Sequence, residues 1–174
     1  MLRIGIGSDT HRLVTGRPLI LGGVRVDSER GSEGHSDADA LAHAIADAIL
    51  GALCEGDVGS HFPDSDPQWR DADSLQLLAR VNRLASERGF RIVNIDSNVL
   101  LERPRLREHI SAMRENLATT LDMENSCVSI KAKTGEGLDA VGRGEAVTVQ
   151  AIVLLAPIRW FPDYKNDESS ENNS

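Results

Sequence analysis

Aromatic residues are scarce in this sequence, in which Phe, Trp and Tyr together make up 3% of 174 residues. Hydrophobic residues still amount to 40%, so a full core is available and must be built mainly from leucine, valine, isoleucine and alanine. The only two cysteines, Cys54 and Cys127, form no CxxC pair. We therefore expect free, at least partly buried thiols in a reducing, cytoplasmic environment.

Basic residues are outnumbered by acidic ones, and long apolar runs are absent from the sequence. Lysine and arginine number 19 against 27 aspartates and glutamates, which gives a net charge of −8. This balance argues against non-specific nucleic-acid binding, although metals or local basic groups would still allow an acidic protein to bind phosphates. No apolar run approaches the length of a membrane span, and the N-terminus enters a predicted strand at once. We expect no membrane association and no targeting peptide.

Strands and helices alternate along the chain, which indicates an α/β (α+β) fold with a mixed β-sheet covered by helices on one face. The clearest helix is predicted at 36–53, where apolar residues recur every four positions from Leu41 to Leu53. Ser36 and Asp39 stand at capping-box spacing at its start. The other predicted helices are 74–88 and 105–121, and the predicted strands are 2–8, a pair within 18–27, 90–101, 128–133 and 145–156.

Two long loops and a tail complete this organisation. Residues 56–73 are acidic and without periodicity, and a loop of this length in a small domain is usually functional or disordered. Residues 134–144 form a glycine-rich loop. We expect one domain over residues 1–157 and a polar, disordered tail over 158–174.

An aspartate and two histidines are spaced to hold a metal ion. Asp9 and His11, placed just beyond the first predicted strand, point to the same side of an extended segment. His43 shares a helix face with Asp39 and Asp47, and either carboxylate is placed to accept the second ring N–H of the histidine. One carboxylate and two imidazoles with an open fourth position are typical of catalytic zinc. The alternative is an ordinary turn and an ordinary helix histidine, since D-x-H alone is a weak signal.

Groups suited to phosphate lie at two predicted helix starts. His35 and Ser36 stand at an N-terminus, where free N–H groups and the helix dipole favour anions. A helix cap and an exposed histidine are the simpler alternative. Arg103 and Arg105 flank Pro104 and form a small basic patch suited to an anion.

The two loops carry further polar candidates. Carboxylates of the acidic loop could bind polyol hydroxyls or a divalent ion, or simply be solvated. Beside the glycine-rich loop, Glu136 lies between two glycines and close to Lys131 and Lys133, an unusual place for a purely structural carboxylate.

Four separated motifs carry a family resemblance when they are taken together. They are G-S-D-T-H at 7–11, G-H-S-D-A-D-A-L-A-H at 34–43, G-D-V-G-S-H-F-P-D-S-D at 56–66 and G-R-G-E at 142–145. Over roughly residues 2–156 the chain resembles the 2-C-methyl-D-erythritol 2,4-cyclodiphosphate synthase family. Members convert 4-diphosphocytidyl-2-C-methyl-D-erythritol 2-phosphate to the cyclodiphosphate with release of CMP, in the non-mevalonate isoprenoid pathway.

The resemblance also implies cofactors and an assembly. It implies one zinc ion per chain on Asp9, His11 and His43, and a second divalent ion, Mg²⁺ or Mn²⁺, on Glu136. It implies a homotrimer with active sites between neighbouring subunits, and a cytidine-diphosphate substrate as the partner.

Further site residues follow from the same resemblance. His35 and Thr134 are implied to stabilise the transition state. Residues 101–107 and 133–136 are implied to hold the cytidine, and the acidic loop to cover the methylerythritol phosphate. The expected substrate contacts are Ser36, Asp57, Gly59, Phe62, Asp64, Asp66, Arg105, Lys133 and Arg143.

Two other functions stay open at this point. One is a zinc hydrolase that uses metal-bound water, which would release an opened phosphate rather than a cyclic product. The other is a trimeric interaction protein that binds an isoprenoid diphosphate at its centre through Arg143 and Glu145. The complete set of metal ligands argues against a role in binding alone.

Overall fold

The computed structural model describes residues 1–63, 65–69 and 72–161. The strands in this part of the chain are β1 (Arg3–Thr15), β2 (Leu19–Leu21), β3 (Val24–Val26), β4 (Arg30–Ser32), β5 (Phe90–Leu100), β6 (Val128–Lys133) and β7 (Ala146–Pro157). The helices are α1 (Ala40–Leu53), α2 (Val58–His61), α3 (Ser74–Glu87), α4 (Ile110–Thr120) and α5 (Asp139–Gly142), with 3₁₀ turns η1 (Pro67–Trp69), η2 (Asn125–Cys127) and η3 (Ile158–Trp160). None of the described helices combines the length and apolar character that crossing a bilayer requires.

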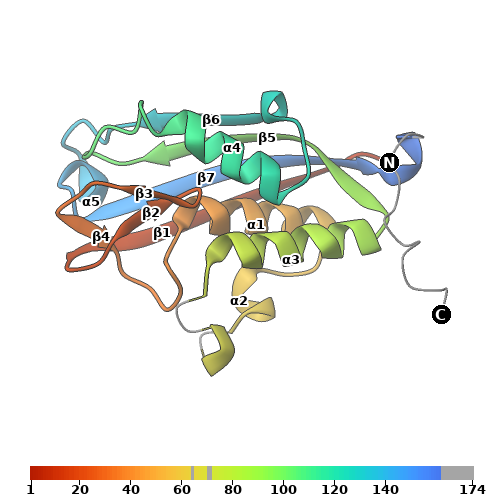
Figure 1. Ribbon diagram of the computed structural model, residues 1–174, viewed down its shortest axis with the longest axis horizontal. Coiled ribbons are helices and arrows are strands. Elements are labelled where there is room, and N and C mark those ends of the chain that lie inside the picture. Colours follow the sequence, from red (N-terminus) through yellow and green to blue (C-terminus); the bar gives the residue numbers. More distant parts are fainter. Residues whose placement is uncertain (64, 70–71, 162–174) are drawn as a thin grey trace, which may run out of the picture.

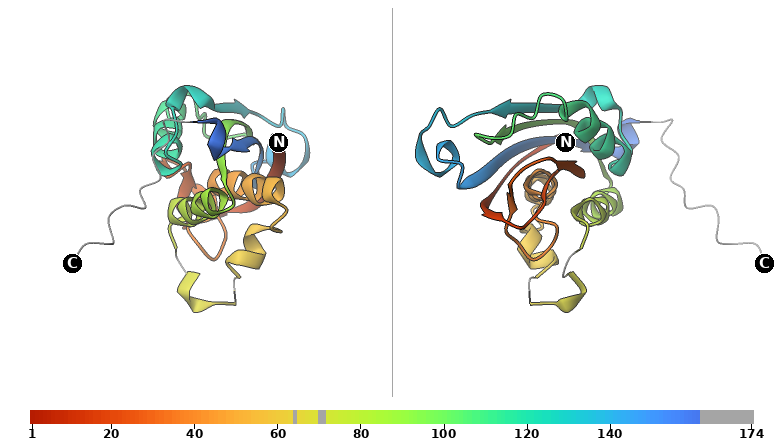
Figure 2. Two further views of the ribbon diagram at one scale, coloured as in Figure 1. Left: turned by 90° about the vertical axis from the view of Figure 1, so that its right-hand side faces the viewer. Right: turned by 60° about the vertical axis from the view of Figure 1, so that its left-hand side comes forward.

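One mixed sheet forms the body of the protein, with strand order β4-β1-β7-β5-β6 (Figure 1). Strands β5 and β6 are parallel, and the other neighbours are antiparallel. Helices α1, α3 and α4 form a layer on one face (Figure 2), and β2 and β3 make a separate ribbon beside them. This arrangement confirms the predicted fold class.

Helix α1 lies directly on the backbone of β1. A Cβ atom placed on Gly5 would be 1.8 Å from the carbonyl oxygen of Ala48, and one on Gly7 would be 2.0 Å from that of Ala44. Only glycine on the strand and small side chains on the helix permit this approach. The contact fixes the height and direction of α1 over the sheet.

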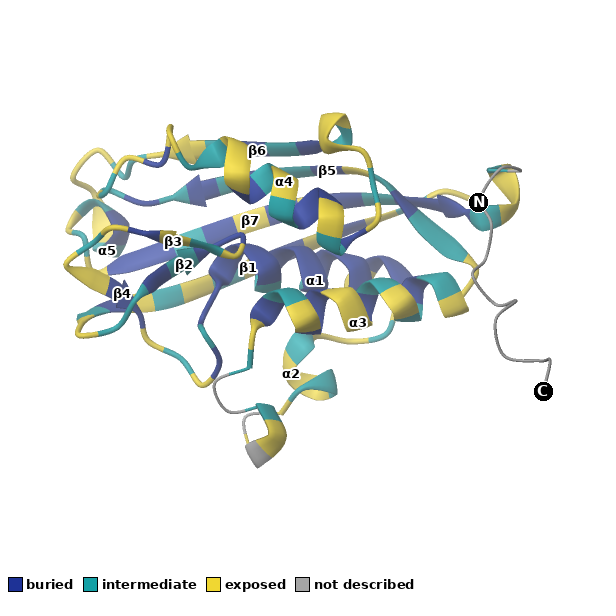
Figure 3. Cartoon of the chain, in the orientation of Figure 1, coloured by how far each residue is buried: buried dark blue, intermediate teal, exposed yellow. Residues whose placement is uncertain are grey.

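Exposed residues occur on the strands as well as on the helices (Figure 3), and on the sheet face turned away from the helices they include large apolar residues. Ile4 and Ile6 on β1 are 72% and 70% exposed, and Ile152 on β7 is 49% exposed. Ile6 and Ile152 are direct cross-strand partners. Exposed apolar patches of this kind mark interaction surfaces.

The first helix begins later than predicted, and Ser36 is not its cap. Asp39 is the N-cap, and its carboxylate accepts the N–H groups of Leu41 and Ala42, each at 3.0 Å. Ala38 has a φ of 55°, which is incompatible with a right-handed helix and separates Ser36 from α1. His35 and Ser36 therefore lie in the loop before α1, not at its N-terminus.

Other boundaries differ in ways that affect the site. The first strand runs on to Thr15, so Asp9 and His11 lie inside it rather than beyond it. The third helix begins at Ile110 instead of 105, because the chain first makes a turn that buries Leu106. The acidic loop contains α2 and η1, the glycine-rich loop contains α5, and β4 was not predicted. In the predicted tail, residues 158–160 form η3, and 162–174 lie outside the described residues.

The glycine contact predicts a sharp contrast between two substitutions. Gly5→Ala should lower the free energy of unfolding by about 3 kcal/mol or more, because backbone atoms of α1 occupy the space that the methyl group needs. Gly51→Ala is the control, since its nearest neighbour would be the Ile6 carbonyl oxygen at 3.7 Å. This control should gain about 0.5–1 kcal/mol from helix propensity. Urea denaturation followed by circular dichroism measures both, and equal stability of Gly5→Ala and the parent would contradict the packing argument.

Candidate metal centre and surrounding site

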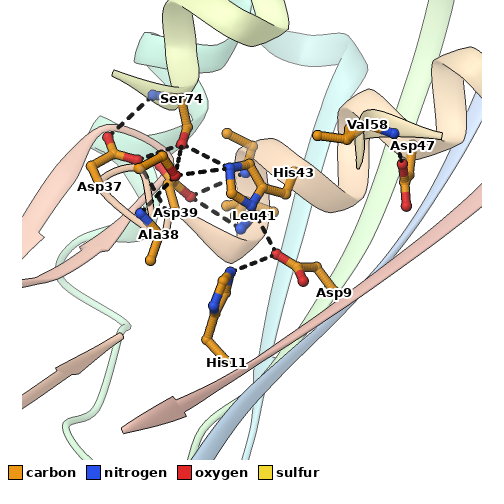
Figure 4. A network of polar contacts seen from close by, with 12 residues as sticks. Asp9, His11, Asp37, Ala38, Asp39, Leu41, His43, Asp47, Val58 and Ser74 are labelled. Carbon is orange, nitrogen blue, oxygen red and sulfur yellow. Dashed lines mark hydrogen bonds and ion pairs between the residues drawn. The ribbon is translucent and has the colours of Figure 1, made fainter. Parts of the chain in front are cut away.

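Strand β1 and helix α1 together create the metal-ligand cluster. Alternate residues of β1 face the helix layer, first Gly5 and Gly7 beneath the helix and then Asp9 and His11. His43 lies in the first turn of α1, where the strand passes beyond the last glycine contact. The two elements therefore bring all three predicted ligands together (Figure 4).

The three side chains are close enough to share one ion. One ligand atom from each lies within 4.8 Å of the other two. The Oδ2 atom of Asp9 is 3.0 Å from Nε2 of His11 and 3.1 Å from Nδ1 of His43. All three residues are partly buried, which limits competition from solvent.

Hydrogen bonds on the far side of each ring decide which nitrogen faces the cluster. Nδ1 of His11 is 2.8 Å from the carbonyl oxygen of Glu33, so it donates its hydrogen there. Nε2 of the same ring is buried, and no hydrogen-bond partner is aligned with it among the described residues. Nε2 of His43 is 2.9 Å from Oγ of Ser74. Two ring lone pairs and a carboxylate thus converge, and such a set of acceptors fits a divalent cation.

The electrostatics of the metal-free cluster follow from this convergence. Burial raises the pKa of Asp9, but its contacts with His11 and His43 outweigh that effect and hold the pKa well below its usual range. For His11, burial lowers the pKa, but the neighbouring Asp9 carboxylate outweighs it and raises the pKa above its ordinary value. Protons therefore compete with a metal ion for the cluster.

Asp39 does not orient His43, contrary to the expectation from helix spacing. It is fully buried, and besides its two cap bonds its carboxylate accepts the N–H groups of Gly22 at 2.9 Å and Gly23 at 2.7 Å. Burial raises the pKa of Asp39, and the backbone donors act against that rise. Its role is to tie the β2–β3 turn to the start of α1.

Asp47 does not contact the His43 ring either. Its Oδ1 atom accepts the N–H of Val58 at 2.8 Å, which anchors the first residue of α2. Burial raises the pKa of Asp47, and the N–H of Val58 opposes that rise. The four-residue spacing places Asp47 one turn beyond His43 along the helix, but the two side chains serve different contacts.

The loop that carries His35 is held by Arg17. One guanidinium nitrogen, Nη2, donates to the carbonyl oxygens of Gly34 and Ser36, each at 3.0 Å, and Nε donates to that of Ser32 at 3.4 Å. These bonds fix the backbone on both sides of His35, whose side chain is exposed. A rigid loop next to the metal cluster suits a residue that acts on substrate.

Ser36 borders the cluster through its side chain. Its Oγ accepts the N–H of Ala38 at 3.1 Å and lies 3.4 Å from Nε2 of His43. Residue 36 is thus near the metal centre, although not through the helix cap that the sequence predicted.

The predicted residues of the acidic loop lie around α2. Asp57 is its N-cap and accepts the N–H and hydroxyl of Ser60 at 2.8 and 2.7 Å, and Gly59 lies inside the helix. Phe62 packs edge-on against Trp69 with ring centres 5.1 Å apart. Asp66 accepts the N–H of Gln68 at 3.0 Å. Asp64 lies outside the described residues.

A second cluster of predicted residues lines a separate pocket of about 970 Å³ between residues 101–110 and 130–136. Arg105, Lys133, Thr134 and Glu136 line it. The Thr134 hydroxyl donates to Oε1 of Glu136 at 2.6 Å. Basic side chains with a hydroxyl and a carboxylate in one pocket suit a nucleoside diphosphate.

The pocket and the metal centre lie on different strands of the sheet. Thr10 of β1 pairs with Thr148 of β7, Thr148 with Leu100 of β5, and Leu100 with Lys133 of β6. Three strand spacings amount to roughly 14 Å. Among the described residues, the two clusters are therefore about three strands apart in one chain.

Sequence reasoning missed three residues that support the cluster. Arg17, Asp37 and Ser74 all act through hydrogen bonds that depend on loop geometry. Asp37 lies inside the second sequence motif, and Ser74 directly follows the helix-capping Asp73. The places of Asp37 within the motif and of Ser74 at a helix start were the signals in the sequence that could have pointed to them.

Comparisons with known proteins agree along most of the chain. The YgbB family model matches residues 2–156. The chain is 54% identical over 154 residues to a protein of Solibacter usitatus named 2-C-methyl-D-erythritol 2,4-cyclodiphosphate synthase, a match that covers 88% of this chain and 97% of the relative. It is 56% identical to the protein of that name from Salinibacter ruber, over 88% of this chain and 98% of the relative.

Solved structures give the same result. A 2C-methyl-D-erythritol-2,4-cyclodiphosphate synthase in a CDP-bound form superposes with a TM-score of 0.82 at 40% identity, covering 88% of this chain and 100% of that one. The bifunctional IspDF of Campylobacter jejuni superposes with a TM-score of 0.87 at 39% identity and covers 90% of this chain. The match spans 42% of that bifunctional protein.

The cluster predicts that metal binding weakens in acid. A metal ion must displace the proton that the raised pKa of His11 retains, so its apparent affinity should fall by about tenfold per pH unit below that pKa. Chelator competition from about pH 8 to about pH 5.5 measures this slope. His109→Ala, in a histidine outside the cluster, should leave the slope unchanged. A pH-independent affinity would rule out His11 as a ligand.

Proposed function

Because the chain belongs to the YgbB family, the family of the 2-C-methyl-D-erythritol 2,4-cyclodiphosphate synthases, we propose that its metal centre is where it makes the cyclodiphosphate. The substrate is 4-diphosphocytidyl-2-C-methyl-D-erythritol 2-phosphate. An oxygen of its 2-phosphate attacks the β-phosphorus, the bond from that phosphorus to the bridging oxygen breaks, and CMP leaves. The observation that carries the proposal is the convergence of Asp9, His11 and His43 within a chain of this family.

Zinc is the metal that we propose for the cluster. Two imidazole nitrogens and one carboxylate oxygen are a ligand set that zinc favours, and they leave a position for a phosphate oxygen. We assign the second divalent ion, Mg²⁺ or Mn²⁺, to Glu136, whose carboxylate faces a pocket with basic walls. When bound, the two ions supply positive charge to the diphosphate.

The remaining catalytic work is alignment and charge neutralisation, since the substrate supplies its own nucleophile. His35 and Ser36 are placed beside the zinc ligands on the loop fixed by Arg17. Thr134 and Lys133 line the pocket proposed for the cytidine diphosphate. Asp57 and the neighbouring acidic loop are the proposed partners of the methylerythritol hydroxyls.

A homotrimer with sites between subunits accounts for two separate observations. The metal centre and the pocket lie roughly 14 Å apart within one chain, as counted across the paired strands. The sheet face with Ile4, Ile6 and Ile152 is exposed in a single chain and suits burial against copies of itself. Cyclic association would place the pocket of one chain beside the metal centre of the next.

Arg143 lies on the surface of a single chain and belongs to neither the metal cluster nor the pocket lining described above. Its guanidinium pairs with Oε2 of Glu145 at 3.0 Å on the surface. Its contact with substrate, like the cytoplasmic location of the enzyme, stays a prediction. The rival in which Arg143 and Glu145 bind an isoprenoid diphosphate leaves the metal ligands without a role.

Product analysis tests the reaction. The zinc-loaded protein with Mg²⁺ should convert the cytidine-diphosphate substrate to equal amounts of CMP and cyclodiphosphate, as measured by mass spectrometry and ³¹P NMR. His43→Ala should lose the zinc and the activity while it keeps the fold, because its neighbours in α1 form the buried stripe. An opened phosphate product would favour the hydrolase instead.

Complementation tests the shared site. His43→Ala and Glu136→Ala chains, mixed equally after joint unfolding and refolding, should recover about a quarter of the parent activity. Each site needs an intact metal centre from one chain and an intact Glu136 from its neighbour, and each is present with a probability of about one half. Each variant refolded alone is the control. No recovery in a confirmed trimer would place both groups of a site on one chain.

A further inference from the structure

Nε2 of His43, the ring nitrogen that points away from Asp9, contacts a serine hydroxyl rather than a carboxylate. Nε2 of His43 lies 2.9 Å from Oγ of Ser74, the first residue of α3, which is 1% exposed. Metal-binding histidines usually donate this N–H directly to a carboxylate, carbonyl or water. Here a buried hydroxyl stands between Nε2 and the carboxylate of Asp37.

Asp37 fixes the direction of that hydroxyl. The Ser74 hydroxyl donates to Oδ1 of Asp37 in a short contact, and the Ser74 N–H donates to Oδ2 at 3.2 Å. A serine hydroxyl has one hydrogen, so toward His43 it acts only as an acceptor. With a cation on Nδ1, the atom 3.1 Å from Asp9, Nε2 of His43 carries the ring hydrogen and donates it to this oxygen. Oγ of Ser36, at 3.4 Å from Nε2, is the more distant acceptor.

We propose that Ser74 and Asp37 are positioning residues that set the tautomer and the orientation of His43 for metal binding. Neither residue touches the proposed ion or the substrate, and both act through the imidazole ring. The proposal rests on the zinc centre of the proposed function and adds the groups that select the ligating nitrogen. They take the role that helix spacing had assigned to Asp39 and Asp47.

The same contacts couple the metal centre to the end of the acidic loop. The N–H of Asp37 donates to the carbonyl oxygen of Ala72 at 3.2 Å, two residues before Ser74. The residues that orient His43 therefore also dock the start of α3 against the loop before α1. A displacement of the start of α3 would change the orientation of a metal ligand, so the position of this segment and metal affinity are linked.

The test is the zinc dissociation constant of Ser74→Ala, measured by chelator competition at neutral pH. Loss of the acceptor should weaken zinc binding by about 10–100-fold. Asp37→Asn should weaken it as well, because the hydroxyl loses its fixed direction. The double variant should bind zinc about as weakly as the weaker single variant, since both act through one chain of bonds. Ser86→Ala, at the other end of α3, is the matched control and should bind zinc like the parent.

A second readout separates positioning from a loss of structure. In the zinc-loaded protein, ¹⁵N NMR of His43 should show the hydrogen on Nε2 and the metal on Nδ1, and Ser74→Ala should shift the Nε2 signal toward that of a ring N–H with a weaker hydrogen bond. Thermal unfolding of the metal-free variants shows whether the fold is kept. If Ser74→Ala does not fold, Asp37→Asn carries the same comparison.

Two results would overturn the proposal. One is a zinc affinity of Ser74→Ala or Asp37→Asn within about twofold of the parent. The other is an equal loss in Ser86→Ala. These outcomes are independent of the reaction. If the parent protein forms CMP and cyclic product while both variants keep full zinc affinity, only the positioning role of Ser74 and Asp37 is refuted. If both variants lose zinc affinity as expected but the parent forms no cyclic product, only the proposed function is refuted.

Discussion

The site depends on how closely α1 approaches β1. With Gly5 and Gly7 beneath the helix, the backbone of α1 rests on the backbone of the strand. The next residue on the same side of β1, Asp9, then meets the first turn of the helix and reaches His43. A larger side chain at either glycine would lift the helix and separate ligands that must lie within a few ångströms of one another. Packing at one end of the strand thus sets the geometry of the proposed metal centre at the other.

Backbone hydrogen bonds, rather than ion pairs, hold the surroundings of the metal centre in place. The carboxylate of Asp39 binds four backbone N–H groups, and Arg17 donates to three carbonyl oxygens of the preceding loop. Such contacts satisfy buried polar groups without relying on the side chains of the proposed metal centre. Asp9 and the two imidazoles are left to contact one another, and Nε2 of His11 is buried without an aligned hydrogen-bond partner among the described residues. This arrangement suits a cation.

The sequence predicted the sheet and the helices from short-range periodicity, and it predicted the cluster of Asp9, His11 and His43 from spacing together with the family resemblance. Alternation in a strand and the four-residue repeat of a helix place Asp9, His11 and His43 on facing surfaces. It did not predict the start of the helix, because Ser36 and Asp39 are both good caps and only the left-handed conformation of Ala38 chooses between them. Contacts that join different elements, such as Ser74 to His43, follow from tertiary packing and leave no periodic signal.

The two faces of the sheet differ in what covers them. One face is closed by helices and holds the core, while the other presents isoleucines from β1 and β7. A single chain thus leaves an apolar surface in water and, across the same strands, keeps its metal centre apart from its nucleotide-sized pocket. Association of copies through the exposed face would bury this apolar surface and bring the metal centre of one chain beside the pocket of the next. In the proposed trimer, the burial that stabilises the assembly is therefore also what completes each active site.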